Sequence, residues 1–333
     1  MKKIIRSADW WEYKLPPLLA IGYATALKVN GSFLSIVPHL LFLLLSLIIG
    51  AIYVSIINDI TDIGIDNTQG KKNRMANVKV YFHWLLPITL ILIGCFCASL
   101  LLPDLRSVIL YCIPWVSFSL YSFKPVRLKD RGILGVFADA SGSHIFTSLL
   151  MISSISFIAH AQMDWIWFIS TGVWAMCYGI RGILWHQFHD RENDIITGTN
   201  TYASNLNPDN FKTKEIMIFV LEAISLLVML SNLFMPLPVL FLGLYILLAF
   251  IRSKSFGYKS VLVISPQNQP LHILMADYYQ VFLPISLLVT ASIDDYRIWF
   301  ILIAHILLFP KKLLYIIKDF WRYTKSRLEF LFN

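Results

Sequence analysis

The chain has 333 residues, of which 57% are hydrophobic and only 14% are charged, and its mean hydropathy is +0.65. Soluble domains carry about 25% charged residues, so this composition excludes an ordinary soluble domain and indicates an integral membrane protein. The formal net charge of +8 does not require a nucleic-acid partner, because basic loops beside a membrane account for it.

Ten apolar runs follow one another along the chain, and a helix needs roughly 20 such residues to cross a hydrocarbon core. Their approximate ranges are 15–31, 35–57, 80–102, 107–121, 135–159, 164–186, 214–232, 235–251, 276–293 and 297–317. Short alternating strands are absent from the pattern, so helices are expected. We therefore predict an all-α protein with nine to ten transmembrane helices in one domain over residues 1–333.

The distribution of lysine and arginine predicts the orientation. With a cytoplasmic N-terminus, 24 of the 28 basic residues fall in cytoplasmic segments, as the positive-inside rule requires. The first apolar run is span-length and follows Trp10, Trp11 and Tyr13, so no cleaved signal peptide is expected. The predicted location is multi-pass in a membrane, the bacterial inner membrane.

The second apolar run ends in an acidic cluster, NDITDIGID. Residues three and four positions apart share a helix face. Asn58, Asp59, Asp62 and Asp66 are therefore expected to gather on one side at the cytoplasmic end of the bundle.

The sixth run ends in a second acidic cluster, HDREND at 189–194. Asp190 and Asp194 are four residues apart, and His186 precedes Asp190 by one turn. Carboxylates placed close together require a compensating cation, and Mg²⁺ takes hard oxygen ligands together with substrate phosphates. The two clusters predict magnesium ligands at Asp59, Asp62, Asp66, Asp190 and Asp194.

Basic residues close to these acids are suited to binding a diphosphate. Two segments carry them, KKNR after the first acidic cluster and YSFKPVRLKDR at 121–131. The predicted substrate-binding residues here are Lys72, Arg74, Tyr121, Lys124, Arg127 and Lys129. A solvated cytoplasmic flank is the alternative interpretation of both segments.

Two further residues are predicted near the substrate. Arg181 lies inside the sixth apolar run, where an arginine faces a cavity or a partner, so both substrate binding and structural pairing are open. His186 could orient a carboxylate or help deprotonate an acceptor, or could be an interfacial histidine.

These motifs resemble those of the UbiA-type intramembrane prenyltransferase superfamily. NDITDIGID matches Asn-Asp-x-x-Asp-x-x-x-Asp, DRENDIITGTNT resembles the second Asp motif, and YSFKPVRLK resembles the family's Tyr-Ser-x-x-Pro-x-x-Leu-Lys loop. The resemblance covers about residues 8–300, ahead of a basic tail at about 311–333. Asn73, Arg74 and Met75 stand where the family often has Asn-Arg-Pro.

The resemblance implies a helical bundle around a lipid-open central cavity beneath a cytoplasmic cap. It implies Mg²⁺ as cofactor, an isoprenyl diphosphate as donor, Asn58 as a substrate-binding residue, and Asp62, Asp190 and Asp194 as catalytic residues. The expected reaction transfers an isoprenyl group to a small hydrophobic acceptor with release of diphosphate.

Two other functions remain open at this stage. The superfamily includes members that transfer phosphoribose to a polyprenyl phosphate. An ion-coupled transporter would also use intramembrane acids, although the acids here lie at span ends and broken helices of the carrier type are not evident.

Overall fold

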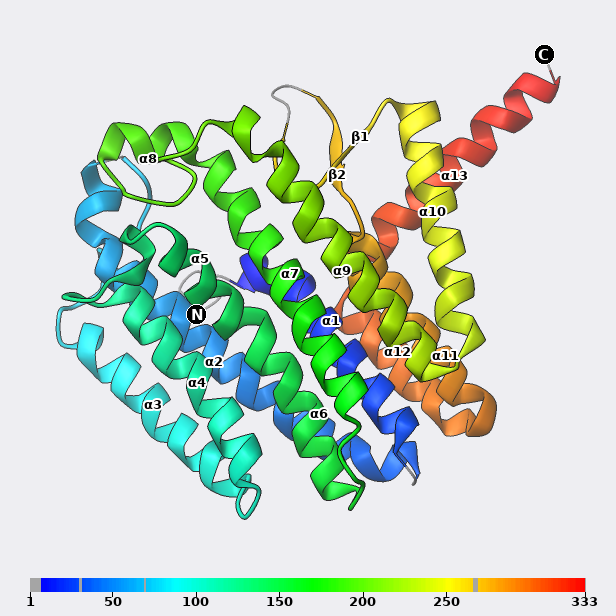
Figure 1. Cartoon of the computed structure of the whole chain (residues 1–333), viewed down its shortest axis with the longest axis horizontal. Coiled ribbons are helices and arrows are strands. Elements are labelled where there is room, and N and C mark those ends of the chain that lie inside the picture. Colours follow the sequence, from blue (N-terminus) through cyan, green and yellow to red (C-terminus); the bar gives the residue numbers. More distant parts are fainter. Residues whose placement is uncertain (1–6, 30–31, 69, 266–268, 333) are drawn as a thin grey trace.

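The computed structural model describes residues 7–29, 32–68, 70–265 and 269–332. Lys2, Lys3 and Arg6, which the charge distribution places in the cytoplasm, lie outside the described residues. The chain forms a bundle in which most helices run side by side (Figure 1). Each predicted apolar run lies mostly within a helix, because a helix satisfies its own backbone groups in an apolar surrounding.

The first half of the chain forms α1 to α6. Their bounds are α1 Ser7–Lys28, α2 Phe33–Thr68, α3 Phe82–Leu100, α4 Leu105–Ser122, α5 Ile133–Ala140 and α6 Phe146–Ile158. Helices α5 and α6 are joined by a π-helical turn at Ser141–Ile145.

The second half forms α7 to α13 and two short strands. Their bounds are α7 Trp165–His189, α8 Arg191–Thr197, α9 Lys212–Leu233, α10 Pro236–Phe256, β1 Lys259–Val261, β2 Leu271–Ile273, α11 Leu283–Asp294, α12 Trp299–Leu308 and α13 Pro310–Phe332. A π-helical turn at Tyr278–Phe282 leads into α11. The two strands pair in parallel, with Ser260 opposite His272.

The length of α2 explains where the first acidic cluster lies. Its 36 residues measure about 54 Å at 1.5 Å per residue, well beyond a hydrocarbon core of about 30 Å. The end that carries the acids therefore projects past the apolar layer. Helix α8, the strands and the end of α2 lie at the same end of the bundle (Figure 1).

Within the described residues, five helical segments are long and apolar enough to cross a membrane: α2, α3, α5 with α6, α9 with the turn before it, and α10. A sixth is added only if α12 and α13 count as one span. The count of nine to ten spans stays a prediction.

The run predicted at 297–317 is not one straight helix. The axis bends by 88° between α12 and α13, at Pro310, which has no N–H to donate and clashes with a preceding helical turn. Mostly apolar residues lie on both sides of this point, at 298–309 and 313–317, so average hydropathy predicted a single span despite Lys311 and Lys312.

Candidate active site

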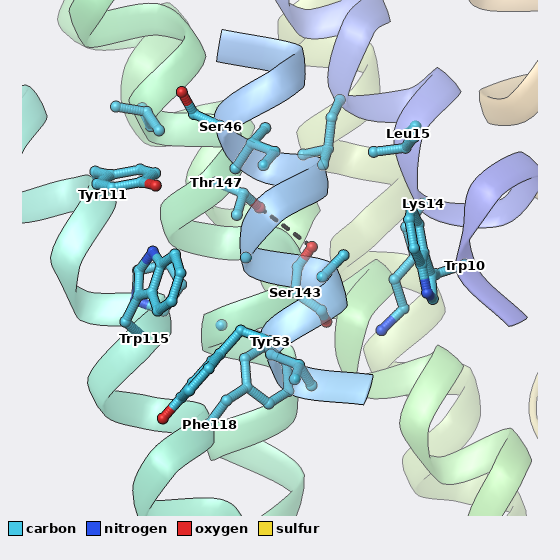
Figure 2. Close-up of a pocket in the computed structure, with 18 of the residues that line it drawn as sticks. Trp10, Lys14, Leu15, Ser46, Tyr53, Tyr111, Trp115, Phe118, Ser143 and Thr147 are labelled. Atoms are coloured by element: carbon cyan, nitrogen blue, oxygen red, sulfur yellow. Dashed lines mark hydrogen bonds between the residues drawn. The ribbon is translucent and has the colours of Figure 1, made fainter. Parts of the chain in front are cut away.

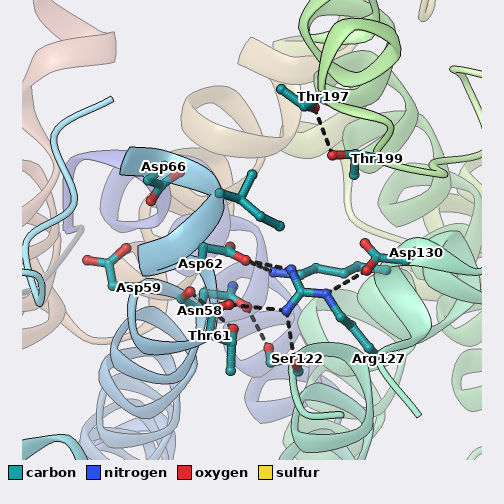
Figure 3. A network of polar contacts seen from close by, with 12 residues as sticks. Asn58, Asp59, Thr61, Asp62, Asp66, Ser122, Arg127, Asp130, Thr197 and Thr199 are labelled. Atoms are coloured by element: carbon teal, nitrogen blue, oxygen red, sulfur yellow. Dashed lines mark hydrogen bonds and ion pairs between the residues drawn. The ribbon is translucent and has the colours of Figure 1, made fainter. Parts of the chain in front are cut away.

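Asn58, Asp62 and Asp66 lie along one face at the end of α2 and line one cavity. They are four residues apart, slightly more than one helical turn. Asp59 is buried and points to a different side of α2 (Figure 3). The side chain of Asn73 donates a 2.7 Å hydrogen bond to Asp66 Oδ2, which ties the following loop to the acidic cluster.

The segment after α4 provides the cations that contact Asp62. Arg127 Nη2 lies 2.9 Å from Asp62 Oδ1, and Lys129 Nζ lies 2.5 Å from the same oxygen. Arg127 is 7% exposed, and its Nε donates to Asp130 at 2.6 Å (Figure 3). Burial lowers the pKa of Lys129, and the neighbouring Asp62 carboxylate opposes that shift.

Asn58 is held by the same segment. Ser122 Oγ donates to Asn58 Oδ1 at 2.5 Å, while Arg127 Nη1 donates to the carbonyl of Thr61 at 3.2 Å. The φ of Arg127 is +38°, in the left-handed region that non-glycine residues seldom adopt. The chain thus turns sharply to aim this guanidinium at the end of α2.

The second acidic cluster lies where α7 ends. Asp190 separates α7 from α8, and Asp194 lies inside α8. Thr201 Oγ1 donates to Asp194 Oδ2 at 3.0 Å. The pKa of the Asp194 carboxyl is raised above its ordinary value, mainly by burial. The Thr201 hydrogen bond opposes this shift, and the nearby Asp190 carboxylate adds to it.

The two acidic clusters meet at one cavity of about 270 Å³. The segment 122–132 bridges them, because Gly132 pairs with Thr201 while Arg127 contacts Asp62. The lining residues with polar side chains are Asn58, Asp62, Asp66, Lys71, Tyr121, Arg127, Lys129, His186, Gln187, Asp190, Asp194, Thr199 and Thr201.

This lining has the chemistry of a site for a metal and an anion. Four carboxylates, two amides and two threonine hydroxyls offer hard oxygen donors, and two lysines and an arginine offer positive charge. No three His, Cys, Asp or Glu side chains in the described part of the chain are gathered closely enough to form a complete protein cage for a metal. Mg²⁺ does not need one, since it usually binds through one or two carboxylates plus substrate phosphates.

Several predicted residues lie away from this cavity. Lys72, Arg74 and Lys124 are exposed, and none of them lines it. Tyr121 and His186 do line it. The role of each predicted residue stays a prediction. Its position inside or outside the cavity decides whether its substitution is a test of substrate binding or a control.

Arg181 lies in a second cavity and has a structural partner. Its Nη1 lies 2.6 Å from Glu222 Oε1 on α9, and both side chains are almost fully buried. Tyr279 also donates to Glu222 Oε1 at 2.9 Å, and Arg181 Nη2 donates to the carbonyl of Leu274 at 2.8 Å. The pairing satisfies the requirement that a buried charge have a partner.

This second cavity, of about 610 Å³, is the larger one. It borders the first through Ile183 and His186, which line both. Two buried polar atoms, Gln280 Oε1 and His272 Nδ1, belong to lining side chains and have no hydrogen-bond partner among the described residues. Such atoms call for a polar group in the cavity.

A third cavity, of about 120 Å³, is enclosed mainly by apolar side chains of α1, α2, α4 and α6 (Figure 2). Trp115, Phe118 and Tyr53 form its aromatic wall, and Lys14 lines both this cavity and the second one. The three cavities thus form a series with shared lining residues.

Sequence reasoning missed some of the lining. Lys71 lines the cavity although Lys72 and Arg74 were the predicted residues of that segment. Thr199 and Thr201 belong to the motif DRENDIITGTNT at 190–201. They were not predicted as lining residues, because threonine is uncharged and common in loops. Glu222, an acid inside an apolar run, was a signal available in the sequence.

A family model described as the UbiA prenyltransferase family matches residues 15–260. The chain belongs to the UbiA prenyltransferase family. The resemblance seen in the motifs is therefore confirmed, and with it the family's integral membrane character. No curated protein sequence matches the chain.

Solved structures of a UbiA homologue from Archaeoglobus fulgidus are similar over nearly the whole length. The form bound to GPP and Mg²⁺ has a TM-score of 0.53 at 14% identity, and the form bound to DMAPP and Mg²⁺ a TM-score of 0.51 at 14% identity. Each match covers 97% of this chain and 98% of the other. At this identity the similarity shows a shared fold, the all-helical UbiA fold.

Proposed function

We propose that the protein transfers an isoprenyl group from an isoprenyl diphosphate to a hydrophobic, hydroxyl-bearing acceptor and releases diphosphate, with Mg²⁺ as cofactor. The whole chain forms the single domain that carries this activity. The observation that carries this proposal is that both acidic clusters and the cations Lys71, Arg127 and Lys129 line a single cavity. The Archaeoglobus homologue bound to GPP and Mg²⁺ supports it.

The residues at the cavity fit magnesium and diphosphate. Asp62 and Asp66 on one side, and Asp190 and Asp194 on the other, are the carboxylates that would hold the metal. When bound, Mg²⁺ supplies positive charge that stabilises the departing diphosphate.

The cations already hold the acids in place. Arg127 and Lys129 both contact Asp62, so their charges are close to the position that a diphosphate would take. Positive charge fixed in a protected site stabilises developing negative charge more strongly than mobile water does. The carbon–oxygen bond of the donor breaks, and its electron pair leaves with the diphosphate. The acceptor oxygen or ring carbon then attacks the allylic cation, and the proton that this atom loses passes to the released diphosphate or to water.

The two other cavities suit the two apolar partners. The cavity at Trp115 and Phe118 offers apolar walls for the isoprenyl chain (Figure 2). The 610 Å³ cavity offers Gln280 Oε1 as an acceptor for a hydroxyl of the second substrate. A buried oxygen without a partner favours a ligand that donates a hydrogen bond to it.

Purified protein incubated with geranylgeranyl diphosphate and Mg²⁺ tests the proposal. We expect slow release of inorganic diphosphate, and faster release when a panel of quinol and phenol acceptors is added. Asp62→Ala and Asp190→Ala should abolish release while leaving the protein folded and inserted in the membrane. Full activity in either variant at saturating Mg²⁺ would remove the assignment of these acids, and transfer of phosphoribose instead would favour the other superfamily reaction.

A further inference from the structure

Helix α13 leaves the bundle at a sharp angle. The segment Tyr296–Leu308 measures about 20 Å at 1.5 Å per residue, which is shorter than a hydrocarbon core of about 30 Å. The chain then bends by 88° into α13. Since α12 belongs to the bundle, a helix at a right angle to it runs nearly parallel to the membrane plane.

The bend is fixed by side chains of α1. Trp11 Nε1 donates to the carbonyl of Leu308 at 2.7 Å, at the end of α12. Glu12 accepts from the backbone N–H groups of Lys311 at 3.3 Å and Lys312 at 3.0 Å, at the start of α13. Three of the helix-end groups that the break exposes thus have side-chain partners, and a carboxylate faces the positive end of α13.

Ion pairs then hold the helix against the end of α10 and against Asp277, which precedes the π-helical turn before α11. Arg252 Nε lies 2.8 Å from Asp319 Oδ2, and Lys312 Nζ lies 3.6 Å from Asp277 Oδ1. Arg322 lies 4.8 Å from the ring centre of Phe256, the last residue of α10. This is the end of the bundle that carries the basic loops (Figure 1), which the positive-inside rule places in the cytoplasm.

The side chains of α13 divide into three faces. The inner face, with Ile316 and Asp319, is buried against the bundle. Two exposed faces remain, and their members recur at helical spacing. The apolar face consists of Leu314, Ile317, Trp321 and Leu328, and the basic face of Lys311, Lys318, Arg322 and Lys325.

The two exposed faces are adjacent. At 3.6 residues per turn, the centres of the apolar and basic faces are about 80° apart around the helix. The apolar face is open, with Leu314 61% and Trp321 62% exposed. The only acid that pairs with the basic face in the described residues is Glu329, which lies 3.7 Å from Lys325. A large apolar face beside a basic one is typical of helices that lie in the membrane interface.

We propose that α13 lies in the headgroup region of the cytoplasmic leaflet, and that its basic face binds the phosphates of anionic phospholipids. The apolar face enters the acyl chains. The basic face, about 80° further around the helix, then lies beside the lipid headgroups. Anionic lipid complements the charge, whereas a zwitterionic headgroup does not. This proposal does not depend on the enzymatic one.

Photo-crosslinking of the full chain in vesicles tests this proposal. The protein is reconstituted in phosphatidylcholine with phosphatidylglycerol, and a trace of either lipid carries a headgroup-proximal photoreactive group. Mass spectrometry then locates the crosslinks. We expect residues 311–328 to be labelled several-fold more by the phosphatidylglycerol probe, and the preference to fall at 1 M salt, where the Debye length is about 3 Å.

A variant with four charges removed and a matched control sharpen the test. Lys311→Gln, Lys318→Gln, Arg322→Gln and Lys325→Gln together should lower the labelling of α13 by the anionic probe to that of the neutral probe. The control removes four other exposed cations, Lys212, Lys214, Lys254 and Lys259, and should keep the preference. Equal labelling of wild-type α13 by the two probes, or no labelling, would overturn the proposal even if every variant failed to fold. Either result would favour an acidic protein partner for the basic face instead.

Discussion

Lys124 and Lys129 are five residues apart in one basic segment, yet the structure separates them. Lys129 contacts Asp62 at 2.5 Å and lines the acidic cavity, whereas Lys124 is exposed and lines none of it. A residue that only flanks the membrane should be replaceable, but one that contacts a charged ligand should not.

We therefore expect Lys129→Gln to raise the KM for the isoprenyl diphosphate about tenfold or more, because a hydrogen bond to a charged group contributes roughly 1.5–3 kcal/mol. Lys124→Gln is the matched control and should leave KM within about twofold, as expected for an exposed surface charge. Steady-state kinetics with varied donor separates the two. Equal effects of both substitutions would contradict the assignment of Lys129 to the donor site.

Gly94 of α3 lies against the aromatic wall of the apolar cavity. A methyl group built on Gly94 would come within 2.7 Å of the Trp115 ring, which is too close without movement of the ring. Trp115 also lines the cavity assigned to the isoprenyl chain. We expect Gly94→Ala to push this ring inward and to lower kcat/KM for geranylgeranyl diphosphate more than for geranyl diphosphate.

The ratio of the two kcat/KM values is the measurement for Gly94. Among the described residues, no atom lies within 4 Å of a methyl group added at Gly243 of α10, so Gly243→Ala should leave the ratio unchanged. A ratio unaffected by Gly94→Ala would mean that the isoprenyl chain does not occupy this cavity.

At the scale of elements, hydropathy predicted most of the helices and missed the bend at Pro310. The run at 297–317 stays apolar through Leu308 and Phe309, and Pro310, Lys311 and Lys312 then mark the point where the direction changes. The partners that stabilise the bend, Trp11 and Glu12, lie about 300 residues earlier. Contacts between residues so far apart leave no local signal in the sequence. The proline itself was a signal, because proline often follows the end of a helix.

Glu12 provides a test of this element. We expect Glu12→Ala to destabilise the start of α13 by about 1 kcal/mol, the typical loss when a capping side chain is removed. Hydrogen exchange at the amides of Lys311 and Lys312 should then be several-fold faster. Glu329→Ala, which removes an exposed carboxylate from the other end of α13, should leave those two amides unchanged, and protection that survives Glu12→Ala would show that the bend is held in another way.

The whole molecule brings together three segments that are far apart in the sequence: the end of α2 at 58–68, the loop at 122–132 and α8 at 191–197. Their motifs were recognisable because metal and phosphate binding require charged residues at fixed spacing. The motifs do not predict which of two neighbouring lysines lines the cavity, and the structure places Lys71 there and not Lys72. That choice depends on the direction in which the loop leaves α2, where Lys71 N–H bonds to the Asp66 carbonyl at 2.9 Å.

If one metal–diphosphate unit joins these segments, its binding should stabilise the whole bundle. A ligand at 100 times its Kd contributes about 2.7 kcal/mol to a protein that binds it only when folded. We expect Mg²⁺ and a non-hydrolysable isoprenyl diphosphate to raise the thermal unfolding temperature together, and either one alone to do so much less, because each provides charge that the other needs. EDTA should remove the increase. Asp190→Asn, which alters only the α7–α8 side of the cavity, should also remove most of it, whereas a full increase in that variant would mean that the second acidic cluster does not take part in binding.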